Sequence, residues 1–146
     1  MIQPFQIVHP GSAEQGATAP HSPKGVPNRG GPMNPSAAAI EARFADAFVR
    51  AEVVWGETNV YVKPERAGEI IRFLHDDVSE QYDYLSDVTA VEYREMERAI
   101  EVVWHLRSLP YRRFLRLKAE LPKGAPLRVP SVWPTYKGAD WLEREC

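Results

Sequence analysis

The sequence predicts an α+β domain: an antiparallel sheet with a β-meander, two amphipathic helices packed on one face, and the start of a short C-terminal helix. Apolar residues recur at helical spacing in residues 36–50 and 64–78. After these helices the period changes from about 3.6 to about 2. Residues 82–93, 100–107 and 113–121 then form three β-prone segments with short connections, which favours a meander.

The N-terminal segment, residues 1–35, has a different composition from the rest of the chain. It holds seven of the thirteen prolines and five of the nine glycines, with almost no charge. Such a segment buries too little apolar surface to offset the entropy of ordering. We predict a disordered tail over 1–35 and an α+β domain over 36–146 that is incomplete at its C-terminus. Met33 is a candidate for the true start of the protein, and N-terminal sequencing that finds Met1 or Ile2 would exclude it.

The first predicted helix runs from Ser36, a candidate N-cap, to about Arg50. Its apolar face consists of Ile40, Phe44, Ala47 and Phe48. Two β-prone runs follow, at residues 53–55 and 60–62. The Gly-Glu-Thr-Asn sequence between them is rich in turn formers and predicts a small hairpin.

The second predicted helix begins at Pro64, because proline suits the first helical turn. Its apolar stripe consists of Ala67, Ile70, Ile71, Leu74 and Val78. Further along, the link 108–111 is too short for a parallel crossover, so the strands that it joins are predicted to be antiparallel. Residues 122–134 are again rich in proline, and residues 138–146 begin an amphipathic helix that the chain end interrupts.

Composition limits the class of protein. With 146 residues, 44% hydrophobic and 26% charged, the chain is long enough for one core. No apolar run approaches the roughly 20 residues of a membrane span, so no direct membrane insertion is predicted. The N-terminus lacks the pattern of a secretory signal. The only cysteine is Cys146, so an intramolecular disulfide and a site of several thiolates are both excluded. A cytosolic chain, held at any membrane by a partner, is expected.

Charges of opposite sign are segregated. Residues 76–101 hold nine acidic residues and two arginines, whereas residues 107–128 hold seven basic residues and one glutamate. Pairing between neighbouring strands is one interpretation. A basic docking surface is the other.

Candidate catalytic groups are few. His75, Asp76 and Asp77 adjoin one another, but neighbours on a helix point about 100° apart and do not converge on one ligand. His105, within a strand, is interpreted as a partly exposed structural side chain, and Cys146 as a small apolar filler. Motifs for phosphate binding, cluster ligation and a serine nucleophile are absent from the sequence.

A nucleic-acid-binding sheet is an alternative from another class. Basic residues of the last strand lie near aromatic ones in the sequence, and the four that would contact a single strand are Arg112, Arg113, Arg116 and Lys118. The pI of about 6.1 and the lack of a nucleic-acid motif disfavour this alternative.

Several segments, taken in order and spacing, resemble the 30 kDa-type subunit, also called the C-type subunit, of respiratory NADH-quinone oxidoreductase (complex I). They are Phe73-Leu-His-Asp-Asp, Tyr84 to Tyr93, Glu101 to Leu109, Arg116 to Leu121, Val129-Pro-Ser-Val-Trp-Pro134 and Ala139 to Glu145. The most specific is Trp141-Leu-Glu-Arg-Glu145, which is similar to the start of the family signature Glu-Arg-Glu-x-x-Asp. The chain ends at Cys146, before the aspartate and a later glycine of that signature.

The resemblance implies a cofactor-free scaffold subunit in the peripheral arm of a proton-translocating enzyme that transfers electrons from NADH to quinone. It implies that this subunit has no catalytic residue, metal or cofactor of its own. Its chief partner would be the D-type subunit, which helps to form the quinone site and which we call the quinone-site subunit, on the cytoplasmic side of the bacterial membrane. The equivalent subunit of a membrane-bound hydrogenase, or of a dehydrogenase with another electron donor, is the alternative within the same lineage.

The partner interface is expected at the C-terminal end of the chain. Aromatic residues in a Pro-rich segment suit burial at an interface, and charged residues of the signature suit fixed ion pairs, within the domain or across to a partner. The candidate residues are Pro130, Trp133, Pro134, Trp141, Glu143, Arg144 and Glu145.

Overall fold

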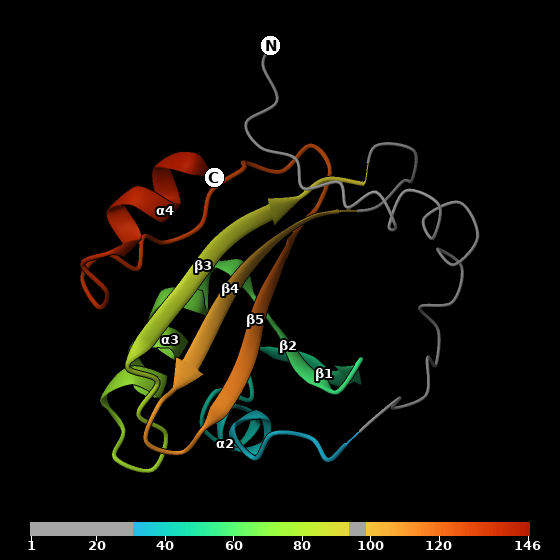
Figure 1. The fold of residues 1–146 in the computed structure, drawn as a ribbon. Coiled ribbons are helices and arrows are strands. Elements are labelled where there is room, and N and C mark those ends of the chain that lie inside the picture. The colour runs from blue at the N-terminus through green and yellow to red at the C-terminus, as the bar shows by residue number, and fades with distance from the viewer. Residues whose placement is uncertain (1–30, 94–98) are drawn as a thin grey trace.

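The computed structural model describes residues 31–93 and 99–146. Most of the predicted tail, residues 1–35, therefore lies outside the described residues. The elements, labelled as in Figure 1, are α2 (Ser36–Arg43), β1 (Phe48–Val54), β2 (Glu57–Val62), the 3-10 turn η1 (Pro64–Arg66), α3 (Ala67–Asp76), β3 (Tyr84–Val91), β4 (Ile100–Ser108), β5 (Arg113–Leu121) and α4 (Ala139–Glu145). This arrangement confirms the predicted α+β class.

The five strands form one mixed sheet in the order β1-β2-β5-β4-β3. The predicted meander is confirmed, because β3 pairs with β4 and β4 with β5, both antiparallel. The prediction of an antiparallel sheet did not include the parallel pair of β2 and β5, in which Thr58 lies opposite Leu115 and Val62 opposite Ala119. As a result, β2 and β5 begin at the same end of the sheet, and the β1–β2 turn lies beside the start of β5.

The first helix is shorter than predicted. It ends at Arg43, and Phe48 already pairs with Val62 as the first residue of β1. The prediction of a helix to Arg50 was wrong in its second half because spacing alone does not separate a helix from a β-prone run such as Phe-Val-Arg-Ala. Ser36 is not the N-cap; it is the first helical residue, and its backbone N–H donates to the Asn34 side chain at 2.9 Å.

The predicted hairpin is present, but its turn lies elsewhere. The turn residues are Trp55 and Gly56, with φ of 55° and 78°, and Glu57, Thr58 and Asn59 belong to β2. Positive φ at both positions matches the twist of a two-residue hairpin. Tryptophan rarely occupies this region of backbone space, so the conformation is held by the pairing of the flanking strands.

The second helix agrees with the prediction at its start, where Pro64 opens η1 and α3 follows. The helix ends at Asp76, and the side chain of Val78 is 75% exposed rather than part of the apolar stripe. The Tyr82 N–H donates to the Leu74 carbonyl at 2.8 Å, which turns the chain towards β3.

One hydrophobic core lies between the helices and one face of the sheet. Figure 1 shows α3 and α4 on the same side of the sheet, with α2 at its lower end. Cross-strand pairs on this face place Trp104 opposite both Val88 and Leu117. The other buried members include Ile40, Val60, Ile70, Ile71, Leu74, Leu106, Leu115 and Ala119. Of the two predicted helices, α3 thus packs on this face, and α2 contributes Ala37 and Ile40 to the same core from the lower end of the sheet.

A buried polar cluster fixes the start of α2 against the β3 side of the core. Ser36 donates its hydroxyl to Glu80, and the Asn34 amide donates to the Tyr82 hydroxyl at 2.8 Å. Glu80, with Ser36 and Tyr82 beside it, is 5% exposed. No pattern in the sequence indicated this cluster, because each of these hydrogen bonds joins residues more than forty positions apart in the chain.

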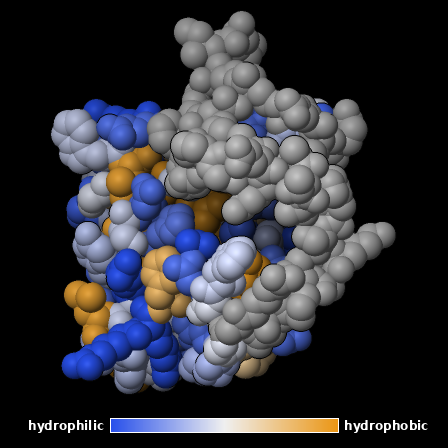
Figure 2. All heavy atoms as spheres, turned by 45° about the vertical axis from the view of Figure 1, so that its right-hand side comes forward, coloured by the Kyte–Doolittle hydropathy of each residue, from blue (hydrophilic) through white to orange (hydrophobic). Residues whose placement is uncertain are grey.

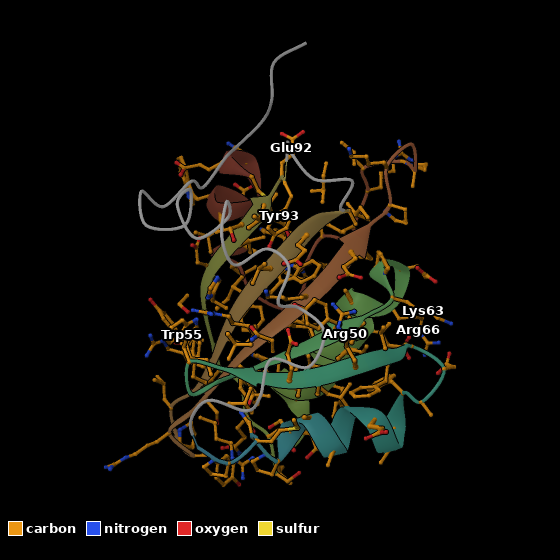
Figure 3. All side chains as sticks on the ribbon, turned by 90° about the vertical axis from the view of Figure 1, so that its right-hand side faces the viewer. Arg50, Trp55, Lys63, Arg66, Glu92 and Tyr93 are labelled. Atoms are coloured by element: carbon orange, nitrogen blue, oxygen red, sulfur yellow. The ribbon has the colours of Figure 1, made fainter. Side chains whose placement is uncertain are left out.

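The opposite face of the sheet, turned towards the viewer in Figure 3, carries charged and polar side chains. Lys118 of β5 lies 3.2 Å from Glu101 of β4, and Arg116 forms an ion pair with Glu57 of β2. On the side seen in Figure 2, the described residues are mostly hydrophilic, with hydrophobic ones in small groups. No helix within the described ranges is long and apolar enough to cross a membrane.

Candidate partner-binding surface

The Pro-rich segment after β5 is held to the domain by two buried side chains. Val132 is 1% exposed and Tyr136 is 7% exposed. The Tyr136 hydroxyl donates to the Tyr82 carbonyl, and its ring meets the ring of His75 edge-on, with 5.2 Å between centroids. Burial, with the nearby carboxylate of Asp83, raises the pKa of Tyr136, so its hydroxyl keeps the proton that it donates.

Helix α4 packs on the same side of the sheet, beside β3 (Figure 1). Ala139 is fully buried, and Leu142 and Cys146 pack against the core. The prediction of a helix starting near residue 138 is confirmed, with Gly138 as its N-cap position. The segment and the helix together form one surface, which we call the C-terminal surface and which comprises residues 129–146.

Glu143 joins the two halves of the C-terminal surface. Its carboxylate accepts a hydrogen bond from the Val132 N–H at 2.7 Å and another from the Ser131 hydroxyl at 2.7 Å. Charged acceptors make the stronger hydrogen bonds of proteins. The charged residues of the signature were expected to form contacts either within the domain or with a partner. Glu143 forms its two hydrogen bonds within the domain.

Two tryptophans stand out from the C-terminal surface. Trp133 is 48% exposed and Trp141 is 70% exposed. The Lys137 ammonium lies 3.7 Å from the ring centroid of Trp133, and the Arg144 guanidinium lies 5.8 Å from that of Trp141. Exposed contacts of a cation with an aromatic ring contribute roughly 0.5–1 kcal/mol. Each exposed indole thus has a weak contact with one charged neighbour.

The other charged residues of the predicted site lie on the outer side of α4. Arg144 forms an ion pair with Asp140 at 3.2 Å, one helical turn earlier. Glu145 is exposed at the end of the helix. An exposed ion pair within a helix contributes at most about 0.5 kcal/mol to stability, so Arg144 can exchange this pair for a contact across an interface. Glu145 is available for such a contact as well.

The two predicted prolines line a shallow hollow between this surface and α3. Pro130 and Pro134 border about 220 Å³ together with Gly68 and Arg72. A Cβ at Gly68 would come within 3.1 Å of the Pro130 Cβ. Glycine at this position therefore permits the close approach of α3 and the Pro-rich segment.

Sequence reasoning missed four contributors to this surface: Gly68, Ser131, Lys137 and Asp140. Lys137 lies four residues after Trp133, and Asp140 lies four residues before Arg144, so the spacing of both pairs is visible in the sequence. Gly68 and Ser131 owe their roles to contacts with distant residues, and no local signal marks them.

The candidate catalytic groups take structural roles. His75 Nδ1 lies 2.7 Å from Asp76, while Asp77 accepts hydrogen bonds from the side chain and backbone of Ser79, which lower its pKa. Burial raises the pKa of the Cys146 thiol, as do the carboxylates of Asp87 and Glu143, and a protonated thiol is a poor nucleophile. Within residues 31–93 and 99–146, no group of three or more histidines, cysteines and carboxylates is arranged to hold a metal ion.

His105 lies on the polar face of the sheet. Its pKa is lowered, first by burial and then by the nearby charge of Arg116. Its ring also lies 6.0 Å from that of Phe114. The neutral imidazole is thus the form that this site favours.

The basic strand is largely paired with carboxylates. Lys118 pairs with Glu101, Arg116 with Glu57, and Arg113 lies 3.6 Å from Glu80. Ion pairs therefore involve each basic residue of β5, whereas a single-strand site needs cations that are free to meet phosphates. These pairs disfavour the nucleic-acid alternative.

Comparison with known proteins gives consistent results. A family model described as "Respiratory-chain NADH dehydrogenase, 30 Kd subunit" matches residues 60–146. The C-type subunit of NADH-quinone oxidoreductase from Rhodobacter capsulatus is 41% identical over 109 residues, which cover 75% of this chain and 54% of that protein. The protein of the same name from Citrifermentans bemidjiense is 37% identical over 113 residues, covering 77% and 68%. That of Salinispora tropica is 33% identical over 143 residues, covering 95% and 55%.

A solved structure shares the fold. A chain of the membrane-bound sulfane sulfur reductase, an archaeal respiratory membrane complex, aligns with a TM-score of 0.59 at 21% identity, covering 74% of this chain and 61% of that one. The chain spans between about half and two thirds of the proteins that it matches here.

Proposed function

Because this chain belongs to the family of the 30 kDa subunit of respiratory-chain NADH dehydrogenase, we propose that it is a scaffold subunit of a proton-translocating NADH-quinone oxidoreductase. In this proposal the enzyme is the whole complex, which passes electrons from NADH to quinone. The subunit holds its neighbours in position and contributes no catalytic residue, metal or cofactor. Residues 36–146 form the folded domain that does so.

The exposure of Trp133 and Trp141 is the observation that supports this proposal most. Tryptophan is among the residues that dominate the binding energy of protein interfaces. Both lie in the region that the family model matches. A tryptophan side chain has only two rotatable bonds, so it loses little conformational entropy on binding.

The quinone-site subunit is the proposed chief partner. The residues that would contact it are Trp133, Pro134, Trp141, Arg144 and Glu145. Glu143 and Pro130 would act indirectly, by holding the two halves of the C-terminal surface together. Anchored in this way, the protein would lie peripherally on the cytoplasmic side of the bacterial membrane.

The equivalent subunit of a related complex with another electron donor is the second candidate. A chain of similar fold occurs in a membrane-bound sulfane sulfur reductase. The relatives at 33% to 41% identity carry the name of the NADH-quinone enzyme, and this favours the first candidate. The identity of the neighbouring genes would separate the two.

Co-purification tests the proposed role. The full-length natural protein, affinity-tagged and co-expressed with the quinone-site subunit, is expected to retain it. Changing both Trp133 and Trp141 to serine should weaken retention at least about tenfold, because each buried aromatic at an interface contributes about 2 kcal/mol or more. Failure of the unchanged protein to retain the quinone-site subunit would contradict the proposal.

A matched control uses Val49, which is 51% exposed on β1. Val49→Ser removes an exposed apolar side chain away from the C-terminal surface and should leave retention unchanged. In a strain that lacks the gene, the unchanged protein should also restore NADH-dependent quinone reduction in membranes, and the double tryptophan variant should not.

A further inference from the structure

A second group of exposed hydrophobic side chains gathers at the end of the sheet where β5 begins. The parallel pairing of β2 with β5 brings the β1–β2 turn to this end, and the antiparallel meander brings the β4–β5 turn and the start of β3. The exposed members are Trp55 (74%), Val78 (75%), Tyr84 (50%), Leu109 (61%) and Tyr111 (42%). Figure 3 shows Trp55 at the hairpin tip, beside the end of β4 and the start of β5.

Three hydrogen bonds join the β4–β5 turn and the start of β5 to the loop between α3 and β3. The Tyr111 hydroxyl donates to the Val78 carbonyl at 2.7 Å, and Arg113 donates to the Ser79 carbonyl at 3.2 Å. The Leu109 N–H donates to the Asp83 carboxylate at 3.1 Å. The segments that carry Val78, Leu109 and Tyr111 are thus tied to one another, which lowers the entropic cost of binding a partner.

The size of this end suits a single protein interface. Neighbouring strands lie about 4.8 Å apart, so β2 and β3, at three spacings, are separated by roughly 14 Å. A typical interface covers about 800 Å² on each partner, a patch roughly 30 Å across. Trp55, Tyr84, Leu109 and Tyr111 lie at or beside the ends of these strands, and the Val78 carbonyl lies 2.7 Å from the Tyr111 hydroxyl, so this end is of a size that suits such a patch.

Two arginines with free guanidinium groups lie at this end. Arg107 of β4 and Arg112 of the β4–β5 turn are exposed, and among the described residues neither guanidinium forms an ion pair or a hydrogen bond. Arg113 and Arg116 beside them are paired with Glu80 and Glu57. The nearby carboxylates of Asp83 and Asp77 remain negatively charged, but each already accepts a hydrogen bond, from the Leu109 N–H and from Ser79. The charged groups at this rim whose hydrogen-bonding atoms are free for a partner are therefore guanidinium groups.

We propose that this end of the sheet is a second protein-docking surface, and that its partner is an acidic protein surface with carboxylates around an apolar centre. Arginine and tyrosine are enriched at interface centres, and a guanidinium can bind a carboxylate through two hydrogen bonds. This sheet-end surface, comprising Trp55, Val78, Tyr84, Arg107 and residues 109–112, is separate from the C-terminal surface. In Figure 1 the β4–β5 turn lies at the bottom and α4 at the upper left.

Site-specific photo-cross-linking tests this proposal. A photoreactive phenylalanine analogue replaces Leu109 in the full-length natural protein, produced in cells together with the products of its neighbouring genes. Irradiation is expected to give a cross-link to another protein at a peptide that contains Asp or Glu. Reversing charge with Arg107→Glu and Arg112→Glu should lower the yield about tenfold, because like charges at a contact repel.

Two further arms make the result decisive. Arg112→Gln, which removes charge without reversing it, should give an intermediate yield, and thermal melting of each variant checks the fold. The same analogue at Val49, at the far end of β1, should not give this cross-link. The proposal is overturned by no cross-link at position 109, by a link to a second copy of this chain, or by a yield that ignores charge reversal. Co-purification with the quinone-site subunit tests the C-terminal surface instead. The proposed function and the proposed docking role of the sheet-end surface can therefore fail independently of each other.

Discussion

The Glu143 carboxylate and the Val132 N–H are joined by a hydrogen bond of 2.7 Å across eleven residues. This bond connects α4 to the buried anchor of the Pro-rich segment and so fixes the spacing between Trp133 and Trp141. The charged residues of the Glu-Arg-Glu sequence therefore divide into one that supports the domain and two that face outwards.

Glu143→Ala should lower the free energy of unfolding by about 1–3 kcal/mol, because the Val132 N–H and the Ser131 hydroxyl both lose their acceptor. Urea denaturation measures the change. Glu145→Ala, an exposed change on the same helix, should stay within about 0.5 kcal/mol. Equal effects of the two substitutions would show that the bond to Val132 contributes nothing.

Gly68→Ala and Gly138→Ala should differ in sign or by about 1 kcal/mol. Alanine reduces the entropy of the unfolded chain at both positions, which favours folding by about 0.5–1 kcal/mol. At Gly138 the new Cβ meets nothing within 4 Å, whereas at Gly68 it meets Pro130 at 3.1 Å. We expect a gain at Gly138 and no gain, or a loss, at Gly68 in thermal and urea unfolding. A gain at Gly68 as large as that at Gly138 contradicts this account.

Tyr82→Phe should destabilise the domain by about 1–3 kcal/mol, since the amide of Asn34 and the hydroxyl of Ser36 lose a buried partner. Tyr84→Phe is the matched control, because that ring is 50% exposed. Its effect should stay within about 0.5 kcal/mol. Unfolding by urea, followed by circular dichroism, compares the two.

Protonation of His105 should lower the free energy of unfolding of the domain as the pH falls. Burial and the charge of Arg116 lower the pKa of the folded imidazole below its ordinary value of 6.5, and the nearby carboxylates of Asp87 and Glu57 oppose this only in part. Above 6.5 the histidine is neutral in both states and costs nothing. As the pH falls below 6.5, the unfolded chain binds a proton that the folded domain resists, so stability declines until the folded pKa is passed.

His105→Gln removes this proton linkage. The variant should lose less stability than the unchanged protein between about pH 7.5 and about pH 5, measured as the free energy of urea unfolding at each pH. Identical pH profiles for the two proteins would rule out His105 as the source.

Much of the fold follows from local pattern. Alternation of apolar and polar residues predicted a strand over 113–121, and β5 occupies Arg113–Leu121. The short link after Ser108 predicted the antiparallel pair of β4 and β5, because a two-strand turn is a local event. Residues 44–50 could not be assigned in this way. Their apolar spacing suits a helix, and only pairing with β2 makes Phe48 the start of a strand.

The residues of the candidate surface could be named from the sequence as a group, but their separate structural roles could not. Glu143 and Glu145 are two residues apart on α4, which is a rotation of about 200° around the helix axis, so their side chains leave the helix on nearly opposite sides. A helix of seven residues has too few apolar positions to show which side faces the domain. The hydrogen bond between Glu143 and Val132 shows which side of α4 faces the domain, and this bond depends on where the Pro-rich segment before α4 packs.

The sequence by itself determined the α+β class, the meander, most element positions and the family, because these depend on residue periodicity and on residues close together in the chain. Only the tertiary structure decided the parallel pairing of β2 with β5, the inward direction of Glu143 and the meeting of Trp55, Leu109 and Tyr111 at one end of the sheet. Each of these joins segments far apart in the chain. Their energies come from burial and hydrogen bonds that exist only once the whole core has assembled, so no local pattern encodes them.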